Sequence, residues 1–280
     1  RYDLARSRTA ATTGAGWQPD VWRALAEELG ILGATLPEDV GGMNGGPVEL
    51  MVVAEALGHA LVVEPYVDTV VLGGGMLHRA GGPRAHAVLE AIASGEAVTA
   101  FAATEPTSGY DFHDVTTTAR RDGGEWVIDG AKIVVTSAPL ATHLLVTART
   151  SGDRRDTAGV SLFLVEFDPA NPRAGVEMHS YRTIDDRRAS DLTFSGLRVP
   201  GDALLGDEGG AWPSVSRGID EATTAVAAEA VGLMRKVLAD TVEYTKQRRQ
   251  FGHPIGSFQA LQHRMVDMYM ELEQAISAVY

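Results

Sequence analysis

The sequence of 280 residues contains no cysteine. This absence excludes disulfides, thiolate nucleophiles and zinc sites built on cysteine, and it is compatible with a reducing compartment. The sequence also has no uninterrupted apolar run of about 20 residues, the length that a membrane-spanning helix needs. Its first residues lack the apolar stretch of a signal peptide. We therefore expect a cytoplasmic protein with no membrane insertion.

Basic residues are scarce. The chain has 24 of them against 37 acidic residues, for a formal net charge of −13. Such a surface repels nucleic acid unless a local basic patch overrides the net charge. We interpret three of the four arginine pairs as solvated surface; the four are Arg120–Arg121, Arg154–Arg155, Arg187–Arg188 and, set apart below, Arg248–Arg249. Because of this net charge we expect no nucleic-acid partner. The eight histidines show no metal-ligand spacing, so we expect no metal site.

Both ends of the chain have the apolar spacing of amphipathic helices. The predicted helices cover residues 21–29, 48–61, 69–79, 85–93, 222–249 and 258–280. The Gly- and Pro-rich stretch from Pro37 to Pro47 predicts a loop. The last predicted helix reaches Tyr280 without a capping signal, and one apolar side of the helical hairpin is left uncovered. Either the natural protein continues past Tyr280 or a partner covers this surface.

The middle of the chain is rich in β-branched residues in short runs separated by Gly, Asp and Pro, a pattern typical of a β-barrel or sandwich. The predicted strands cover residues 97–103, 115–120, 125–128, 132–135, 143–148, 160–165 and 189–194. Asp129–Gly130 suits a hairpin turn, and Pro200 to Gly210 suits a hinge. We expect an α+β protein of three domains: residues 1–96 helical, 97–206 β, and 207–280 helical and partial.

Four segments occur in an order and spacing that none of them would establish alone. They are Phe101–Asp111 (FAATEPTSGYD), Asp129–Thr136 (DGAKIVVT), Val199–Gly209 and Tyr244–Gln259. Together they resemble the signature segments of the acyl-CoA dehydrogenase family. The text of residues 228–232 and 258–265 is most similar to subunits of heteromeric bacterial dehydrogenases of the pimeloyl-CoA or steroid side-chain type.

The resemblance implies a helical N-terminal domain, a central β-barrel and a C-terminal helical bundle, here apparently incomplete, with FAD held between the β unit and the C-terminal helices. The implied cofactor-binding residues are Phe101, Ala103, Thr104, Val134, Thr136, Arg248, Gln250, Phe251 and Gln259. The first three match residues at the flavin's polar edge, and Thr136 matches a hydroxyl near flavin N5. The last four match residues that reach the AMP half of an FAD in a neighbouring subunit, where an arginine suits pyrophosphate. That role requires an oligomer, usually a dimer of dimers.

The implied reaction is α,β-dehydrogenation of an acyl-CoA. A carboxylate with a raised pKa removes the α proton while hydride leaves the β carbon for flavin N5, and an electron-transfer flavoprotein or similar acceptor takes the electrons. Most members place this base in the last third of the chain, so we expect it beyond Tyr280. A minority place it early in the long C-terminal helix, at Ala222 here, which leaves Glu221 as a weak candidate.

Three residues depart from the family pattern. Val134 replaces a tryptophan that covers the flavin, Thr223 replaces an arginine, and Tyr110 replaces a serine on the substrate side. Tyr110 and Thr223 are therefore candidate substrate-binding residues in an altered pocket. Two alternatives stay open: a non-catalytic subunit that completes a partner's FAD site, or a flavin monooxygenase or oxidase on the same fold.

Overall fold

A computed structural model describes residues 2, 4–14 and 16–280. The chain forms two compact units, each assembled from separate stretches of sequence. Unit 1 comprises residues 1–4, 46–62 and 223–280, and unit 2 comprises residues 5–45 and 63–222. We describe each unit by itself. No helix in the described part of the chain is long and apolar enough to cross a bilayer.

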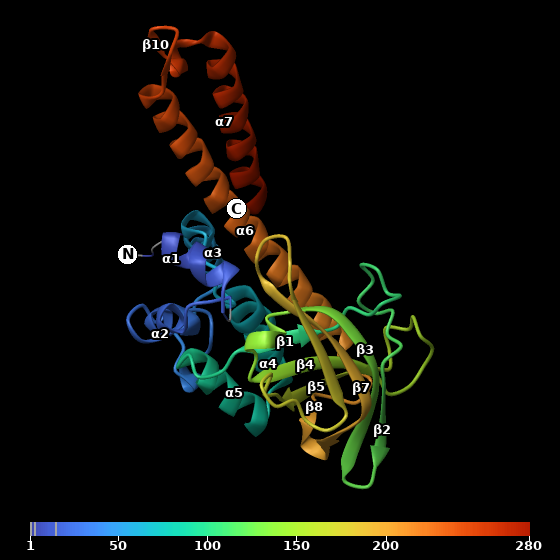
Figure 1. Ribbon diagram of the computed structural model, residues 1–280. Helices are drawn as coiled ribbons and strands as arrows, with labels where there is room; N and C mark the ends of the chain where they lie inside the picture. Colours follow the sequence, from blue (N-terminus) through green and yellow to red (C-terminus); the bar gives the residue numbers. More distant parts are fainter. Residues whose placement is uncertain (1, 3, 15) are drawn as a thin grey trace. The chain divides into compact units, whose positions relative to one another are not determined.

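In unit 2 the structure confirms most of the helices that apolar spacing predicted in the first hundred residues. They are α1 (Leu4–Thr12), α2 (Pro19–Glu27), a π-helical segment (Val67–Gly74), α4 (Gly75–Ala80) and α5 (Pro83–Ala93) (Figure 1). Proline occupies the first turn of α2 and α5, where no amide hydrogen is needed. The predicted loop at Pro37–Pro47 is present but contains a short 3₁₀ turn at Glu38–Val40.

The prediction of a single α-helix over residues 69–79 was wrong, because the first part of this stretch is π-helical. Thr99, in the neighbouring strand, explains the widening. Its hydroxyl donates to the carbonyl of Asp68 at 3.1 Å, and its amide donates to the hydroxyl of Thr69 at 3.2 Å. A side chain that takes a helix carbonyl displaces the regular backbone bond and loosens the turn.

The strands of the middle of the chain form one eight-stranded sheet, in the order β6-β7-β3-β2-β4-β5-β8, with β1 beside β4. The strands are β1 (Thr99–Ala102), β2 (Thr118–Asp122), β3 (Glu125–Thr136), β4 (His143–Arg149), β5 (Val160–Glu166), β6 (Val176–Arg182), β7 (Arg188–Pro200) and β8 (Leu204–Leu205). The α+β class is confirmed, and β6 is a strand that the sequence reading missed.

The hairpin predicted at Asp129–Gly130 was also wrong. The β2–β3 turn is at Gly123–Gly124, and Asp129–Gly130 lies inside β3, where the register against β7 shifts. Gly130 has a φ of 150°, and a Cβ there would overlap Thr117. The glycine therefore serves close backbone packing within a strand. Pro200, the first residue of the predicted hinge, is the last residue of strand β7.

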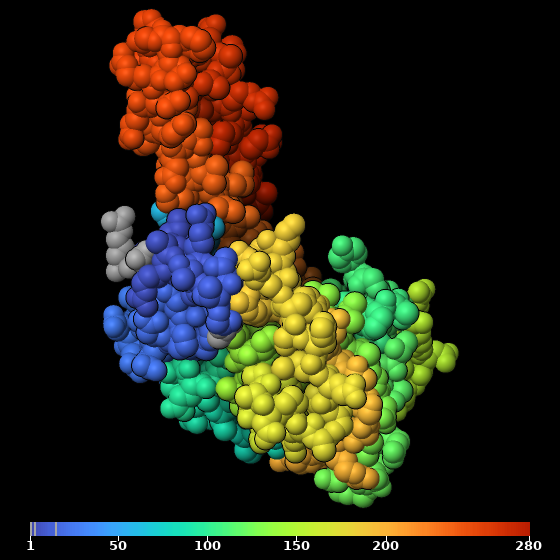
Figure 2. All heavy atoms as spheres, viewed as in Figure 1, coloured from blue at the N-terminus to red at the C-terminus, as the bar shows by residue number. Residues whose placement is uncertain are grey.

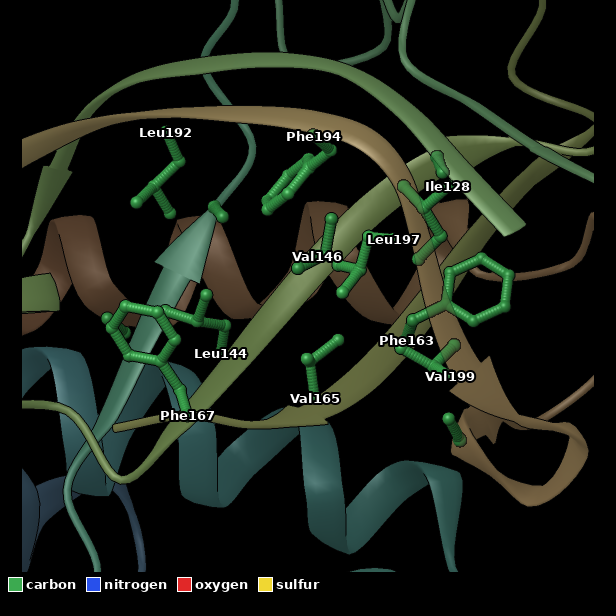
Figure 3. Packing of buried hydrophobic residues seen from close by; sticks show 14 of the residues in the cluster. Ile128, Leu144, Val146, Phe163, Val165, Phe167, Leu192, Phe194, Leu197 and Val199 are labelled. Carbon is green, nitrogen blue, oxygen red and sulfur yellow. The ribbon is translucent and has the colours of Figure 1, made fainter. Parts of the chain in front are cut away.

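Apolar side chains from β3, β4, β5 and β7 meet inside the sheet (Figure 3). The labelled members include Ile128, Leu144, Val146, Phe163 and Leu197. Trp126 packs edge-on against Phe163 with ring centroids 5.2 Å apart. This shared core fixes the strands whose ends carry the signature segments.

A buried arginine joins two loops beside this core. Arg149, at the end of β4, is 8% exposed. Its guanidinium nitrogens lie 2.8 to 3.3 Å from six backbone carbonyl oxygens, so its five N–H groups serve six acceptors and one hydrogen is shared; the carbonyls are those of His113, Val115, Ser151, Arg154, Asp156 and Ala158. The planar fork of an arginine can satisfy several acceptors at once. Arg149 thereby holds the loop that follows Thr104–Pro106 (the TEP segment) against the loop between β4 and β5.

Unit 1 is helical. It contains α3 (Pro47–Ala60), most of α6 (Trp212–Gln247) and α7 (Gln259–Val279), with a short turn of β9 (Arg249–Gln250) and β10 (His253–Pro254) between the last two. The atoms of α6 and α7, orange to red, pack along each other near this turn (Figure 2). Helix α6 begins at Trp212 rather than at the predicted Ala222.

Two glycines let α3 and α6 cross at backbone contact. A Cβ on Gly58 would overlap the carbonyl oxygen of Glu229, and a Cβ on Gly232 would overlap that of Glu55. The ion pair between Arg235 and Glu55, at 2.5 Å, lies at the same crossing. Close approach therefore depends on the missing side chain at both positions.

We expect Gly232→Ala to destabilise the protein by about 2 kcal/mol or more, because overpacking forces the helices apart. Chemical denaturation followed by circular dichroism measures this loss. Gly124→Ala is the control, since a Cβ at Gly124 meets nothing within 4 Å. Equal stability of the two variants would contradict the close crossing.

Candidate functional site

Two of the signature segments lie side by side in unit 2. The amide of Ile133 in β3 donates to the carbonyl of Thr104, just beyond β1, at 2.9 Å. The ammonium of Lys132 donates to the carbonyl of Ala103 at 3.3 Å. The structure thus brings the residues expected at the flavin's polar edge, Phe101, Ala103 and Thr104, next to the segment that carries Val134 and Thr136.

A buried ion pair locks the two segments together. Lys132 Nζ lies 2.8 Å from Glu105 Oε1, and both side chains are 0% exposed. Burial tends to raise the pKa of Glu105, but the ammonium of Lys132 and hydrogen bonds from Thr116 and Thr117 outweigh it and lower the pKa to about 2. Burial lowers the pKa of Lys132 to about 8, although Glu105 opposes this shift. The pair is structural because it anchors the backbone of the site.

A bulge in β3 turns Val134 outward. The register of β3 against β7 shifts between Lys132 and Val135, and Val134 is left 48% exposed with a φ of 51°. A positive φ is an outlier for a β-branched residue. The carboxylate of Asp191 supports it by accepting from the Val134 amide at 3.0 Å and from the Tyr181 hydroxyl at 2.8 Å.

Two residues further along, a second carboxylate holds the end of the same strand. Asp68, 9% exposed, accepts hydrogen bonds from the hydroxyl of Thr136, at 3.0 Å, and from that of Ser137. Ser137 is itself left-handed, with a φ of 61°. The sequence reading missed Asp68, Ser137 and Asp191. The one unusual feature of the sequence there is an aspartate within the largely apolar run Val67–Val71, and this feature does not show which residues the carboxylate contacts.

Backbone strain at Val134 leads to a test. We expect Val134→Asn to raise the free energy of unfolding by about 1 kcal/mol, because asparagine tolerates the left-handed region that valine resists. Urea denaturation measures the change. Val48→Asn is the control, since Val48 is 57% exposed but does not have a positive φ. Destabilisation by Val134→Asn would contradict a strained valine.

The remaining expected cofactor residues gather in unit 1, at the turn between α6 and α7. Arg248 and Gln250 are exposed, Phe251 is 88% exposed with a φ of 52°, and Gln259 begins α7. The ring centroid of Phe251 lies 6.1 Å from that of Phe258. The turn thus presents a guanidinium, an amide and an aromatic ring on one short, exposed segment.

The candidate catalytic and substrate residues are placed differently. The carboxylate of Glu221 is bound by Arg79 at 2.8 Å and by Arg217 at 2.9 Å, a geometry that suits a structural ion pair. Tyr110, in the loop after the TEP segment, is fully exposed. Thr223 is exposed on α6.

Three family models match the chain in order. They are the acyl-CoA dehydrogenase N-terminal domain at residues 4–96, the middle domain at residues 100–197 and the C-terminal domain at residues 209–280. The boundaries of the three domains proposed from the sequence remain a prediction, since compactness divides the chain in another way.

Similar proteins agree with these matches. Acyl-CoA dehydrogenase FadE12 of Mycobacterium tuberculosis is 34% identical over 279 residues, which cover 98% of this chain and 69% of the relative. The solved FAD complex of PigA superposes with a TM-score of 0.88 at 26% identity, over 99% of this chain and 72% of that one. The ChsE4–ChsE5 complex of M. tuberculosis gives 0.83 at 27% identity, over 96% and 69%. The chain belongs to the acyl-CoA dehydrogenase family of flavin-dependent oxidoreductases.

Proposed function

We propose that the protein carries out FAD-dependent α,β-dehydrogenation of an acyl-CoA thioester, as a subunit of a homo- or hetero-oligomer. The observation that carries this proposal is the junction of β1 and β3. There the backbone from Phe101 to Thr104 adjoins the segment from Lys132 to Thr136 through the Ile133–Thr104 hydrogen bond of 2.9 Å. A family signature gains weight when its parts meet in the fold as its chemistry requires.

The residues at this junction fit a flavin. A flavin ring has two broad apolar faces and a polar edge, so its site needs an apolar surface beside backbone and hydroxyl groups. Val134 offers an exposed apolar side chain on a strained bulge. Thr136, half-buried, offers a hydroxyl, and the backbone of Phe101, Ala103 and Thr104 offers polar groups. When bound, FAD supplies the acceptor for the hydride that leaves the β carbon of the substrate.

The turn between α6 and α7 would serve the FAD of a neighbouring subunit. Arg248 can bind two pyrophosphate oxygens at once. Gln250 and Gln259 can hydrogen-bond the AMP half, and Phe251 can stack on it. The exposure of Arg248 and Phe251 leaves them available to another chain. A partner of the same or a related sequence is therefore part of this proposal, and the solved ChsE4–ChsE5 complex is an example of paired chains with this fold.

The proton-abstracting carboxylate is not assigned within the described residues. Glu221 is held between the guanidinium groups of Arg79 and Arg217, which fix its carboxylate in place. Tyr110 and Thr223 remain proposed substrate contacts in place of the family's serine and arginine. The electron acceptor, an electron-transfer flavoprotein or a similar protein, is part of the same proposal.

Absorption spectra of the purified protein test the proposal. We expect bound flavin with bands in the visible, bleached without oxygen by an acyl-CoA of suitable chain length. Arg248→Ala should lower the FAD content at least tenfold, because it removes a bidentate phosphate contact. Arg23→Ala is the control, since Arg23 is also exposed but lies outside every signature segment.

Three outcomes would point elsewhere. Protein that binds flavin only after a second subunit is added would support the non-catalytic subunit. Flavin that is reoxidised by oxygen with hydroxylation of a substrate would support a monooxygenase. Protein that binds no flavin in any combination would refute the proposal.

A further inference from the structure

Asp68 is a buried carboxylate that the proposed function has not used. It lies in the π-helical segment Val67–Gly74, a conformation that occurs frequently at functional sites. Its two oxygens are divided between two hydroxyls: Oδ1 accepts from Thr136 at 3.0 Å, and Oδ2 accepts from Ser137. Thr136 is the last residue of β3 and Ser137 follows it, 68 and 69 residues further along the chain than Asp68.

This arrangement fixes the direction of the Thr136 hydroxyl. An ionised carboxylate only accepts hydrogen bonds, and a threonine hydroxyl has one proton to donate. With that proton directed to Asp68, the Thr136 oxygen can offer only lone pairs to a ligand. The same residue without Asp68 could turn and donate.

The backbone around Thr136 is held against relaxation. Val134 and Ser137, on either side of it, both have positive φ, at 51° and 61°. The carboxylate of Asp191 accepts a hydrogen bond from the Val134 amide, and that of Asp68 accepts one from the Ser137 hydroxyl. Strained residues persist where the surroundings over-determine them, and they cluster at sites of function. The position of the Thr136 oxygen is therefore set from both directions.

We propose that Asp68 is a positioning residue that makes the Thr136 hydroxyl a hydrogen-bond acceptor toward the cofactor. This rests on the proposed function and on the family resemblance, by which the Thr136 hydroxyl would lie near N5 of a bound FAD. A hydroxyl that only accepts favours the reduced cofactor, whose N5 carries a hydrogen, over the oxidised cofactor, whose N5 is itself an acceptor. Asp68 thereby raises the preference of the site for the reduced state.

A double-mutant cycle separates this role from the effect of the negative charge of Asp68. The measured quantity is the ratio of the affinities of the apoprotein for reduced and oxidised FAD, obtained by titration and by the midpoint potential of the bound cofactor. We expect Asp68→Ala to lower the affinity for reduced FAD relative to oxidised FAD about tenfold when Thr136 is present. This corresponds to a midpoint potential that is lower by about 30 mV for a two-electron couple. In a Thr136→Val background the same change should have less than a twofold effect.

Two further variants keep the test decisive. Ser137→Ala removes the other hydrogen bond of the same carboxylate, so it controls for loss of packing and should leave the ratio within twofold. Asp68→Leu, which keeps the branching and the number of heavy atoms of the side chain, replaces Asp68→Ala if that variant is poorly folded.

An equal effect of Asp68→Ala in both backgrounds would show that only its charge acts, and no effect in either would remove its role; each result overturns the inference while leaving the proposed function intact. Wild-type protein that binds no FAD, either alone or with any second subunit, would instead refute the proposed function and the inference with it.

Discussion

Replacing Glu105 by glutamine should lower the free energy of unfolding by about 3 to 5 kcal/mol, because it leaves the buried ammonium of Lys132 without a counter-charge. The two groups are 2.8 Å apart and wholly inaccessible to solvent. Glu105 also accepts from the amides of Thr116 and Thr117, at 2.7 and 3.0 Å, and the glutamine amide would turn a donor toward one of them. Chemical denaturation at pH 7 measures the loss.

The same carboxylate makes the effect depend on pH. Glu105 titrates at about 2 in the folded protein and at an ordinary 4.5 when unfolded. Its contribution is therefore complete above about pH 4.5 and is lost as the pH falls toward 2. We expect the gap in stability between wild type and Glu105→Gln to shrink between pH 5 and pH 3.

Two controls define the result. Glu125→Gln breaks an exposed pair with Arg198 and should cost less than about 1 kcal/mol. Lys132→Met combined with Glu105→Gln should be more stable than the sum of the single changes predicts, since no charge is then left unpaired. Additive losses would contradict a coupled pair.

Arg149→Lys should cost about 3 kcal/mol, even though it conserves the charge. A lysine ammonium has three donors and no planar fork, so it cannot reach the six carbonyls that the guanidinium satisfies. Carbonyls left buried without a partner each carry a desolvation penalty. Denaturation measures the loss, and limited proteolysis should cut the loops at residues 104–117 and 150–159 sooner than in wild type.

Arg121→Lys is the matched control for this change. Arg121 is exposed and pairs with Glu208 at 3.2 Å, so its replacement should change stability by less than about 1 kcal/mol. If Arg149→Lys behaves like this control, the two loops do not depend on the guanidinium.

Periodicity and the order of motifs were enough to predict most helices, most strands, the α+β class and the family. Local signals failed where contacts distant in sequence decided the conformation. Asp129–Gly130 has the composition of a hairpin turn, yet close packing against Thr117 places the glycine inside a strand. Residues 69–79 have α-helical periodicity, yet the hydroxyl of Thr99 opens their first turns.

The residues of the candidate site likewise include some that the sequence predicts and some that it does not. The segments at Phe101–Thr104 and at Lys132–Thr136 could be found because each has a recognisable text. Asp68 could not, because nothing in the run from Val67 to Val71 shows that its carboxylate meets Thr136 and Ser137. Strain at Val134 was equally hidden, since valine is an ordinary strand residue until its register against β7 is known.

The glycine crossing of α3 and α6 has a consequence for synthesis on the ribosome. Helix α3 carries buried Met51, Ala54 and Leu57, and it belongs to the same unit as residues 223–280. At 5–20 residues per second, Gly232 is synthesised roughly 170 residues, or about 10 to 35 s, after Gly58. During that interval α3 has no native partner from α6, so we expect the nascent chain to depend on chaperones over this stretch, and a pause in translation before residue 232 to reduce the yield of folded protein.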